Sequence, residues 1–157
     1  MDRKIIEQYE HGGDKLRQVV QGLTHDNLHA LPVPGTWSIQ QIIIHLLDSD
    51  LVLADRMKRV IAEDKPSLLA FDENRWAKQL AYDFRSAEDA VALFALNRKQ
   101  MAGVMRRLPD EAFARTGTHN ERGVQTLEQI VGFAVQHLDH HLKFARDKRE
   151  KLGKLMW

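Results

Sequence analysis

Residues 126–142, TLEQIVGFAVQHLDHHL, form the most regular helical pattern of the chain and indicate its fold class. The stretch opens with a capping box, in which Thr126 accepts a hydrogen bond from the backbone and Gln129 returns one. Apolar residues then recur every three or four positions, as on the buried face of a helix: Leu127, Ile130, Ala134, Leu138 and Leu142. We therefore expect a helix over residues 126–151 with one side packed in a core.

Three further amphipathic patterns lie towards the N-terminus, over residues 2–21, 38–62 and 86–107. Adjacent glycines, Gly12 and Gly13, interrupt the first pattern and mark either a kink or a close backbone contact. No alternating pattern is long enough to predict a strand. The 157 residues fit one domain over 1–157, so the sequence predicts an all-α, four-helix bundle.

The connections between these helices differ in length. A capping box starts the second helix, with Ser38 and Gln41 as its two partners. Residues 63–85 then form a connection between the second and third helices that is longer than usual, so we expect a crossover or a partly helical lid. Such connections join parallel neighbours in bundles. Asn97 falls on the apolar stripe of the third helix, where we expect a hydrogen-bonded core amide.

Composition excludes several function classes. The chain has no cysteine, which rules out disulfide bonds, thiolate zinc sites and cysteine nucleophiles. Its net charge of +1 does not indicate a nucleic-acid binder. The basic residues near the end complement the C-terminal end of a helix instead. With no secretory signal and no apolar run of roughly 20 residues, we expect a cytoplasmic protein that is not in a membrane.

Two histidines of the last helix face the predicted core. His137 and His141 are four residues apart, so they project within roughly 40° of each other, at the centre of the apolar stripe. Two stacked imidazoles there need up to four hydrogen-bond partners, and the neighbouring side chains offer almost none. One metal ion would use a nitrogen from each ring. His45, on the apolar side of the second helix, can complete a set of three nitrogen ligands.

The remaining histidines are expected to lie outside this set. His140 points to the edge of the stripe, and the others lie in exposed or loop contexts: His11, His25, His29 and His119. His119 is also a candidate for the rim of a pocket. The chain has neither the His-Glu-x-x-His motif nor the Glu-x-x-His pairs of di-iron bundles, which favours a single metal ion.

Two carboxylates near His45 are candidate catalytic residues. Asp48 and Asp50 can accept a hydrogen bond from a histidine ligand, act as a base, or lie on the solvated side of the helix. Solvation is the simplest interpretation of each.

The chain resembles the DinB/YfiT-like superfamily of bacterial four-helix bundles, in its DinB-like branch. The matching segments are PGTWS at 34–38, HLLDSD at 45–50, FDENRWA at 71–77, GTH at 117–119, and TL at 126–127 with HLDHH at 137–141. The resemblance implies that His45, His137 and His141 are the metal ligands. It also implies up-down-down-up connectivity and a homodimer. Many members carry Glu where this chain has Asp50, which leaves a chemical role of that acid in doubt.

These features predict a metalloenzyme that acts on a small molecule. The expected ion is zinc or nickel, and a three-histidine set does not distinguish the two. The metal would activate either a low-molecular-weight thiol, for S-transfer, or water, for hydrolysis. The resemblance covers thiol-dependent S-transferases, a mycothiol-dependent isomerase and proposed hydrolases. The alternative is a non-catalytic, stress-associated module that binds a metal or a partner.

Overall fold

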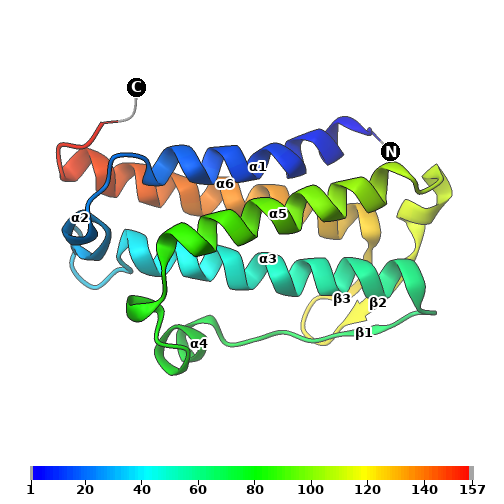
Figure 1. Cartoon of the computed structure of the whole chain (residues 1–157). Coiled ribbons are helices and arrows are strands. Elements are labelled where there is room, and N and C mark those ends of the chain that lie inside the picture. Colours follow the sequence, from blue (N-terminus) through cyan, green and yellow to red (C-terminus); the bar gives the residue numbers. More distant parts are fainter. Residues whose placement is uncertain (1, 156–157) are drawn as a thin grey trace.

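Four long helices form the body of the protein (Figure 1). The computed structural model describes residues 2–155, so Met1 and residues 156–157 of the predicted single domain lie outside the described residues. The long helices are α1 (Lys4–Val20), α3 (Ile39–Ala62), α5 (Ala87–Arg106) and α6 (Leu127–Lys151). Helices α1 and α3 each pack against both α5 and α6. The predicted four-helix bundle is confirmed.

The direction of each helix can be followed by colour in Figure 1. Helices α1 and α6 run one way along the bundle, and α3 and α5 run the other way. The chain therefore has to return along the bundle between α3 and α5, and residues 63–85 make that return. They contain strand β1 (Ser67–Leu68), helix α4 (Glu73–Gln79) and the 3₁₀ helix η1 (Tyr82–Phe84). Of the two predicted alternatives, a crossover or a partly helical lid, the segment is a crossover, and part of it is helical.

Side-chain caps fix the starts of two bundle helices. Ser38 Oγ accepts from the Gln41 N–H at 3.1 Å, and Gln41 Oε1 accepts from the Ser38 N–H at 3.0 Å. Thr126 and Gln129 form the same reciprocal pair at the start of α6. Both predicted capping boxes are confirmed, because local sequence is sufficient to satisfy the free N–H groups at a helix start.

The two glycines of α1 mark close contacts, since α1 continues through them as one helix. A Cβ atom at Gly13 would lie 2.8 Å from the Cβ of Ala95, so the absence of a side chain lets α1 approach α5. A Cβ at Gly12 would lie 2.2 Å from Nη1 of Arg98. The first glycine therefore makes room for a buried side chain, and the second makes room for a neighbouring helix.

A small sheet corrects the expectation that the chain contains no strand. Strand β1 pairs in parallel with β2 (Thr116–His119), and β2 pairs antiparallel with β3 (Gly123–Thr126). These strands have two to four residues, too few to show an alternating pattern, and their pairing depends on partners distant in sequence. The sheet joins the crossover between α3 and α5 to the hairpin before α6. The short helix α2 (His25–His29) and the 3₁₀ helix η2 (Asp110–Ala114) complete the fold.

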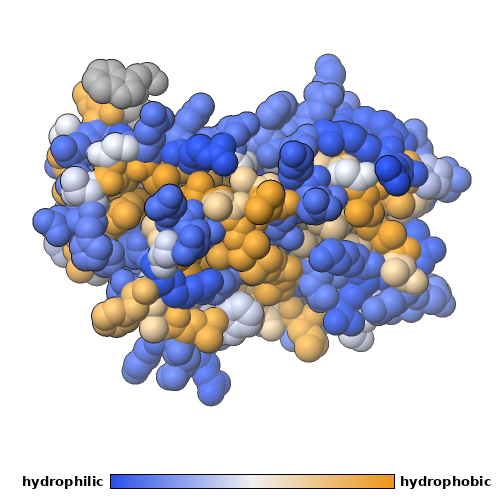
Figure 2. Space-filling view, in the orientation of Figure 1, coloured by the Kyte–Doolittle hydropathy of each residue, from blue (hydrophilic) through white to orange (hydrophobic). Residues whose placement is uncertain are grey.

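The surface is polar with apolar patches. Figure 2 shows apolar side chains on the face where α5 lies beside α3. The large apolar side chains exposed on these two helices are Leu51, Leu93, Leu96 and Val104. No helix in residues 2–155 is both long enough and apolar enough to span a membrane.

Candidate metal centre

The three predicted histidine ligands lie together inside the bundle. His45 comes from α3, and His137 and His141 come from consecutive turns of α6, which packs against α3. One ring nitrogen of each histidine lies within 4.8 Å of those of the other two. The Nε2 atoms of His45 and His137 are 3.3 Å apart. Three nitrogens therefore surround one point.

Burial keeps these imidazoles neutral. His45 is 1% exposed, and burial lowers its pKa to about 4, with repulsion from His141 adding to the effect and Asp48 opposing it. Burial also lowers the pKa of His137 to about 3 and that of His141 to about 4. At neutral pH all three rings therefore have a free nitrogen lone pair, which is the form that binds a metal ion.

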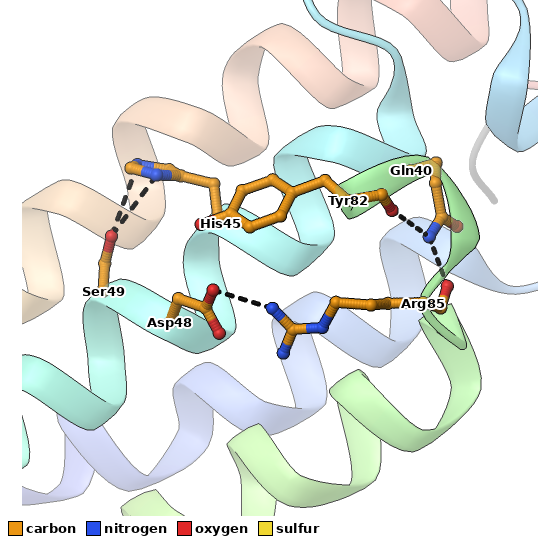
Figure 3. A network of polar contacts seen from close by, with 6 residues as sticks. All are labelled: Gln40, His45, Asp48, Ser49, Tyr82 and Arg85. Carbon is orange, nitrogen blue, oxygen red and sulfur yellow. Dashed lines mark hydrogen bonds and ion pairs between the residues drawn. The ribbon is translucent and has the colours of Figure 1, made fainter. Parts of the chain in front are cut away.

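This donor set fits a single divalent ion. Three neutral nitrogens at mutual metal-binding distance match the ligand sets of zinc and of other late transition metals. No carboxylate belongs to the group, so its three donors carry no charge of their own. Ser49, one turn after His45 on α3, has its Oγ 3.4 Å from Nε2 of His45, as Figure 3 shows.

Glu73, the first residue of α4, is a site residue that the sequence analysis missed. One of its carboxylate oxygens lies 3.7 Å from Nε2 of His45, although its side chain is 54% exposed. It comes from the crossover, 28 positions along the chain from His45, so periodicity gave no sign of this contact. The only sequence signal was its place in the segment 71–77 that resembles the family.

The histidines line a cavity of about 320 Å³. Its wall combines α3 and α6 with the crossover and the β2–β3 hairpin. The lining residues outside the triad include Ser49, Arg56, Phe71, Glu73, His119, Glu121, Arg122, Phe133 and His140. His140 belongs to this wall, but it is outside the group that could hold a metal.

The two candidate catalytic carboxylates do not line this cavity. Asp48 is 6% exposed, and its Oδ2 accepts a hydrogen bond from Nη1 of Arg85 at 2.7 Å (Figure 3). Asp50 is 1% exposed and accepts from Arg98 and Asn97. The expectation that both are solvated is wrong. Each acid neutralises an arginine from a distant segment, and that pairing cannot be read from helical phase.

The partner of Asp50, Arg98, connects all four helices of the bundle. The Arg98 Nε on α5 donates to Asp50 of α3 at 2.8 Å, Nη1 donates to the carbonyl of Tyr9 on α1, and Nη2 donates to that of Ala134 on α6. One guanidinium therefore contacts all four helices. Asn97 is hydrogen-bonded as predicted, because its Nδ2 donates to Asp50 Oδ2 at 2.8 Å, but it is half-buried and does not lie in the core.

His119 corrects another expectation. It is 3% exposed at the end of β2 and lines the cavity, so the expectation of an exposed residue is wrong and His119 belongs to the cavity wall. Its Nδ1 accepts from the backbone N–H groups of Glu121 and Arg122 at 3.2 and 3.3 Å. An accepting Nδ1 in a neutral ring places the proton on Nε2. His119 is thereby fixed as a donor rather than a base.

A second cavity, of about 450 Å³, adjoins the first. The two share His141 and Glu73, and the second is lined mainly by apolar groups, including Trp37, Ile42 and Phe144. Lys148 also lines it. This lysine is 4% exposed and donates to the hydroxyl of Thr36.

Known proteins share both this sequence pattern and this fold. The family model of the DinB superfamily matches residues 8–145. "Putative metal-dependent hydrolase YfiT" of Bacillus subtilis is 26% identical over 96% of this chain and 85% of the relative. A relative from Oceanobacillus iheyensis with the same descriptive name is 29% identical over 81% of this chain and 73% of the relative.

Two solved structures share the architecture. That of YfiT, described as having an unusual four-helix bundle topology, matches with a TM-score of 0.89 at 26% identity, over 96% of this chain and 86% of that one. The mycothiol-dependent maleylpyruvate isomerase matches with a TM-score of 0.69 at 12% identity, over 89% of this chain and 58% of that one. At that identity the second likeness shows the fold alone.

Proposed function

This chain belongs to the DinB superfamily, and on the strength of its cluster of three histidines we propose that it is a mononuclear, metal-dependent hydrolase. The observation that carries the proposal is the convergence of three neutral ring nitrogens within 4.8 Å at the wall of a cavity. The metal-dependent hydrolase names of its relatives agree with it.

In this proposal His45, His137 and His141 hold one zinc or nickel ion. When bound, the ion would supply Lewis acidity, which lowers the pKa of water towards neutrality and holds a thiol as its thiolate. The rigid helices α3 and α6 supply all three ligands, so the geometry of the site does not depend on a loop. Trp37, Phe71 and Phe133 lie against the imidazole rings, and an apolar shell of this kind controls the access of solvent to a metal site.

Glu73 is the proposed general base. Its carboxylate lies 3.7 Å from Nε2 of His45, lines the cavity and is half exposed, so it can accept a proton from an attacking water and release it to solvent. A positioned base of this kind contributes on the order of 10²–10⁴ in rate. Asp48 and Asp50 are held by arginines away from the cavity and have no part in the proposed chemistry.

Thiol transfer is the second candidate, and the second cavity favours it. A transferase needs room for two substrates next to one reactive centre, and the two cavities meet at His141 and Glu73. Because the chain has no cysteine, the thiol would have to come from a low-molecular-weight cosubstrate. The apolar second cavity would then bind the electrophile or the thiol, with both reaching the same metal ion.

Metal analysis tests the site itself. Untagged wild-type protein should contain about one zinc or nickel per chain, as a single three-histidine site requires. His137→Ala should lose it, whereas the matched variant His140→Ala should keep it, because His140 lines the same cavity outside the triad. A metal-free wild type that takes up no zinc or nickel on titration would refute the site.

Activity assays then separate the candidate functions. Chromogenic esters and amides should be hydrolysed by the metal-loaded wild type and at least 100-fold more slowly by Glu73→Gln. Transfer from a panel of low-molecular-weight thiols to a chromogenic electrophile, lost in His137→Ala, would favour the second candidate instead. Metal-loaded protein that performs neither reaction would favour the non-catalytic module.

A further inference from the structure

One face of α3 runs along the whole cavity. His45, Ser49, Leu53 and Arg56 all line it, at spacings of four, four and three residues. With a rise of 1.5 Å per residue, the Cα atoms of His45 and Arg56 are separated by about 16 Å along the helix. Side chains of a helix lean towards its N-terminus, so the Arg56 side chain leans back towards His45. The cavity therefore has a histidine end and an arginine end.

Arg56 supplies a positive charge that the protein itself does not neutralise. It is 7% exposed, and among residues 2–155 no carboxylate forms an ion pair with it. Its Nη2 donates to the carbonyl of Leu69, and its Nε is buried without a partner. A guanidinium has five N–H donors. The described residues therefore accept hydrogen bonds from only some of those of Arg56. Burial, and then repulsion from Arg122, lower its pKa.

Arg122 brings a second guanidinium to the same end. It lies on the β2–β3 hairpin and stacks over the ring of Phe133 at 4.3 Å, a contact that holds the cation at the cavity wall. Within the described part of the chain it has no ion-pair partner. Glu121 also lines the cavity here, so this end carries two positive charges and one negative charge.

His119 completes the arginine end with a neutral donor. Its Nδ1 is occupied by two backbone N–H groups, so the proton on Nε2 is available for donation. Two guanidiniums and one imidazole N–H give several donors and a net positive charge at one end of the cavity. Arginine forms strong, directional charge-assisted hydrogen bonds with carboxylates and phosphates. Two arginines and Glu121 give this end a net charge of one, which a singly charged carboxylate matches.

We propose that the arginine end binds a carboxylate of the substrate, whose reacting group lies at the histidine end. The substrate class is therefore a small, elongated carboxylic acid with its electrophilic group several bonds from the carboxylate. This inference rests on the proposed function for the position of the reacting group. The carboxylate site itself needs only Arg56, Arg122 and His119.

The test uses probes that report each end separately. Monohydroxamates of linear dicarboxylic acids with four to eight carbons carry a metal-chelating group at one end and a carboxylate at the other. Their methyl esters are matched neutral probes. Dissociation constants would be measured by calorimetry on zinc-loaded wild-type protein. At one chain length, the acid should bind about tenfold more tightly than its ester, which is the usual gain from one charge-assisted interaction.

Variants assign the preference to the arginine end. Arg122→Gln and Arg56→Met should each reduce the acid-to-ester ratio towards one while ester binding stays constant. Arg59→Gln is the matched control, since Arg59 lies on the same helix and pairs with Asp55 outside this cavity. Glu121→Gln should increase the ratio several-fold, because it removes the negative charge; a purely structural role for the arginines gives no such increase. If buried Arg56→Met fails to fold, exposed Arg122→Gln and Glu121→Gln decide the question.

The outcomes separate this inference from the proposed function. If the wild type binds the hydroxamate probes but binds acid and ester equally at every chain length, the carboxylate site is overturned. The metal site then stays intact. If no hydroxamate binds because the metal site is wrong, adipate becomes the probe, followed by NMR shifts in the protein. Adipate binding that Arg122→Gln weakens supports the carboxylate site, and absence of adipate binding overturns it.

Discussion

Replacing Gly12 by alanine should destabilise the protein although alanine is the better helix former. The added methyl group would lie 2.2 Å from Nη1 of Arg98 and 2.7 Å from Cδ2 of Leu138, both far inside van der Waals contact. Arg98 is 2% exposed, and its guanidinium is held by Asp50 and by two backbone carbonyls. It cannot move aside without breaking these bonds.

The expected magnitude follows from the ion pair. Separating a buried pair whose members are 2% and 1% exposed leaves an uncompensated charge and costs roughly 3–5 kcal/mol. Alanine in place of glycine returns about 1 kcal/mol of helix propensity. The free energy of unfolding should therefore fall by about 2–4 kcal/mol. At roughly 2–4 °C per kcal/mol for a domain of this size, the melting temperature should fall by about 4–16 °C.

Urea unfolding followed by circular dichroism measures this change, with Gly103→Ala as the matched control. Gly103 lies in α5, and a Cβ there would meet nothing within 4 Å. Its replacement should stabilise the protein by up to about 1 kcal/mol. The two glycine-to-alanine changes should thus act in opposite directions. A Gly12→Ala protein as stable as the wild type would refute the placement of Arg98.

Three further outcomes are expected. Folding lowers the pKa of His45, His137 and His141 from their usual value to about 4, 3 and 4, so the unfolded chain takes up protons first as the pH falls. In EDTA, the free energy of unfolding should be constant above about pH 7.5 and should fall by up to about 2 kcal/mol per histidine by pH 5; a flat profile in urea titrations would contradict this. Asp50→Asn should lower the free energy of unfolding by about 3 kcal/mol. The metal content per folded chain, measured by elemental analysis, should stay at the wild-type value; loss of metal would show that the acid supports the site. Thr126→Ala should cost about 1 kcal/mol in thermal unfolding, because it removes the cap of α6, and an unchanged melting temperature would show that the capping bond is not formed in solution.

The helices could be predicted from sequence because their determinants are local. Apolar spacing and capping boxes placed the starts of α3 and α6 correctly, and the inward phase of His137 and His141 followed from the same period. The small sheet could not be predicted this way. Its longest strands have four residues, and β1 finds its partner about 50 positions along the chain.

The residues missed at the site share a physical cause. Glu73 and Arg122 reach the cavity from connections whose course is decided by tertiary contacts. Asp50 looked solvated because its partner, Arg98, lies 48 positions away on another helix. Helical periodicity indicates on which side of a helix a residue lies. It does not identify the residue of another helix that neutralises a buried charge. The expected homodimer likewise depends on contacts beyond one chain and stays a prediction.

The site residues come from two parts of the fold: the bundle helices, and the two connections that the small sheet joins (Figure 1). All three histidines come from α3 and α6, whereas Phe71, Glu73, His119 and Arg122 come from the two connections that the sheet joins. Connections tolerate insertion and substitution far better than packed helices do. Changes in the crossover and the hairpin can therefore reshape one wall of the cavity while the three histidines of the proposed metal site, on α3 and α6, stay in place.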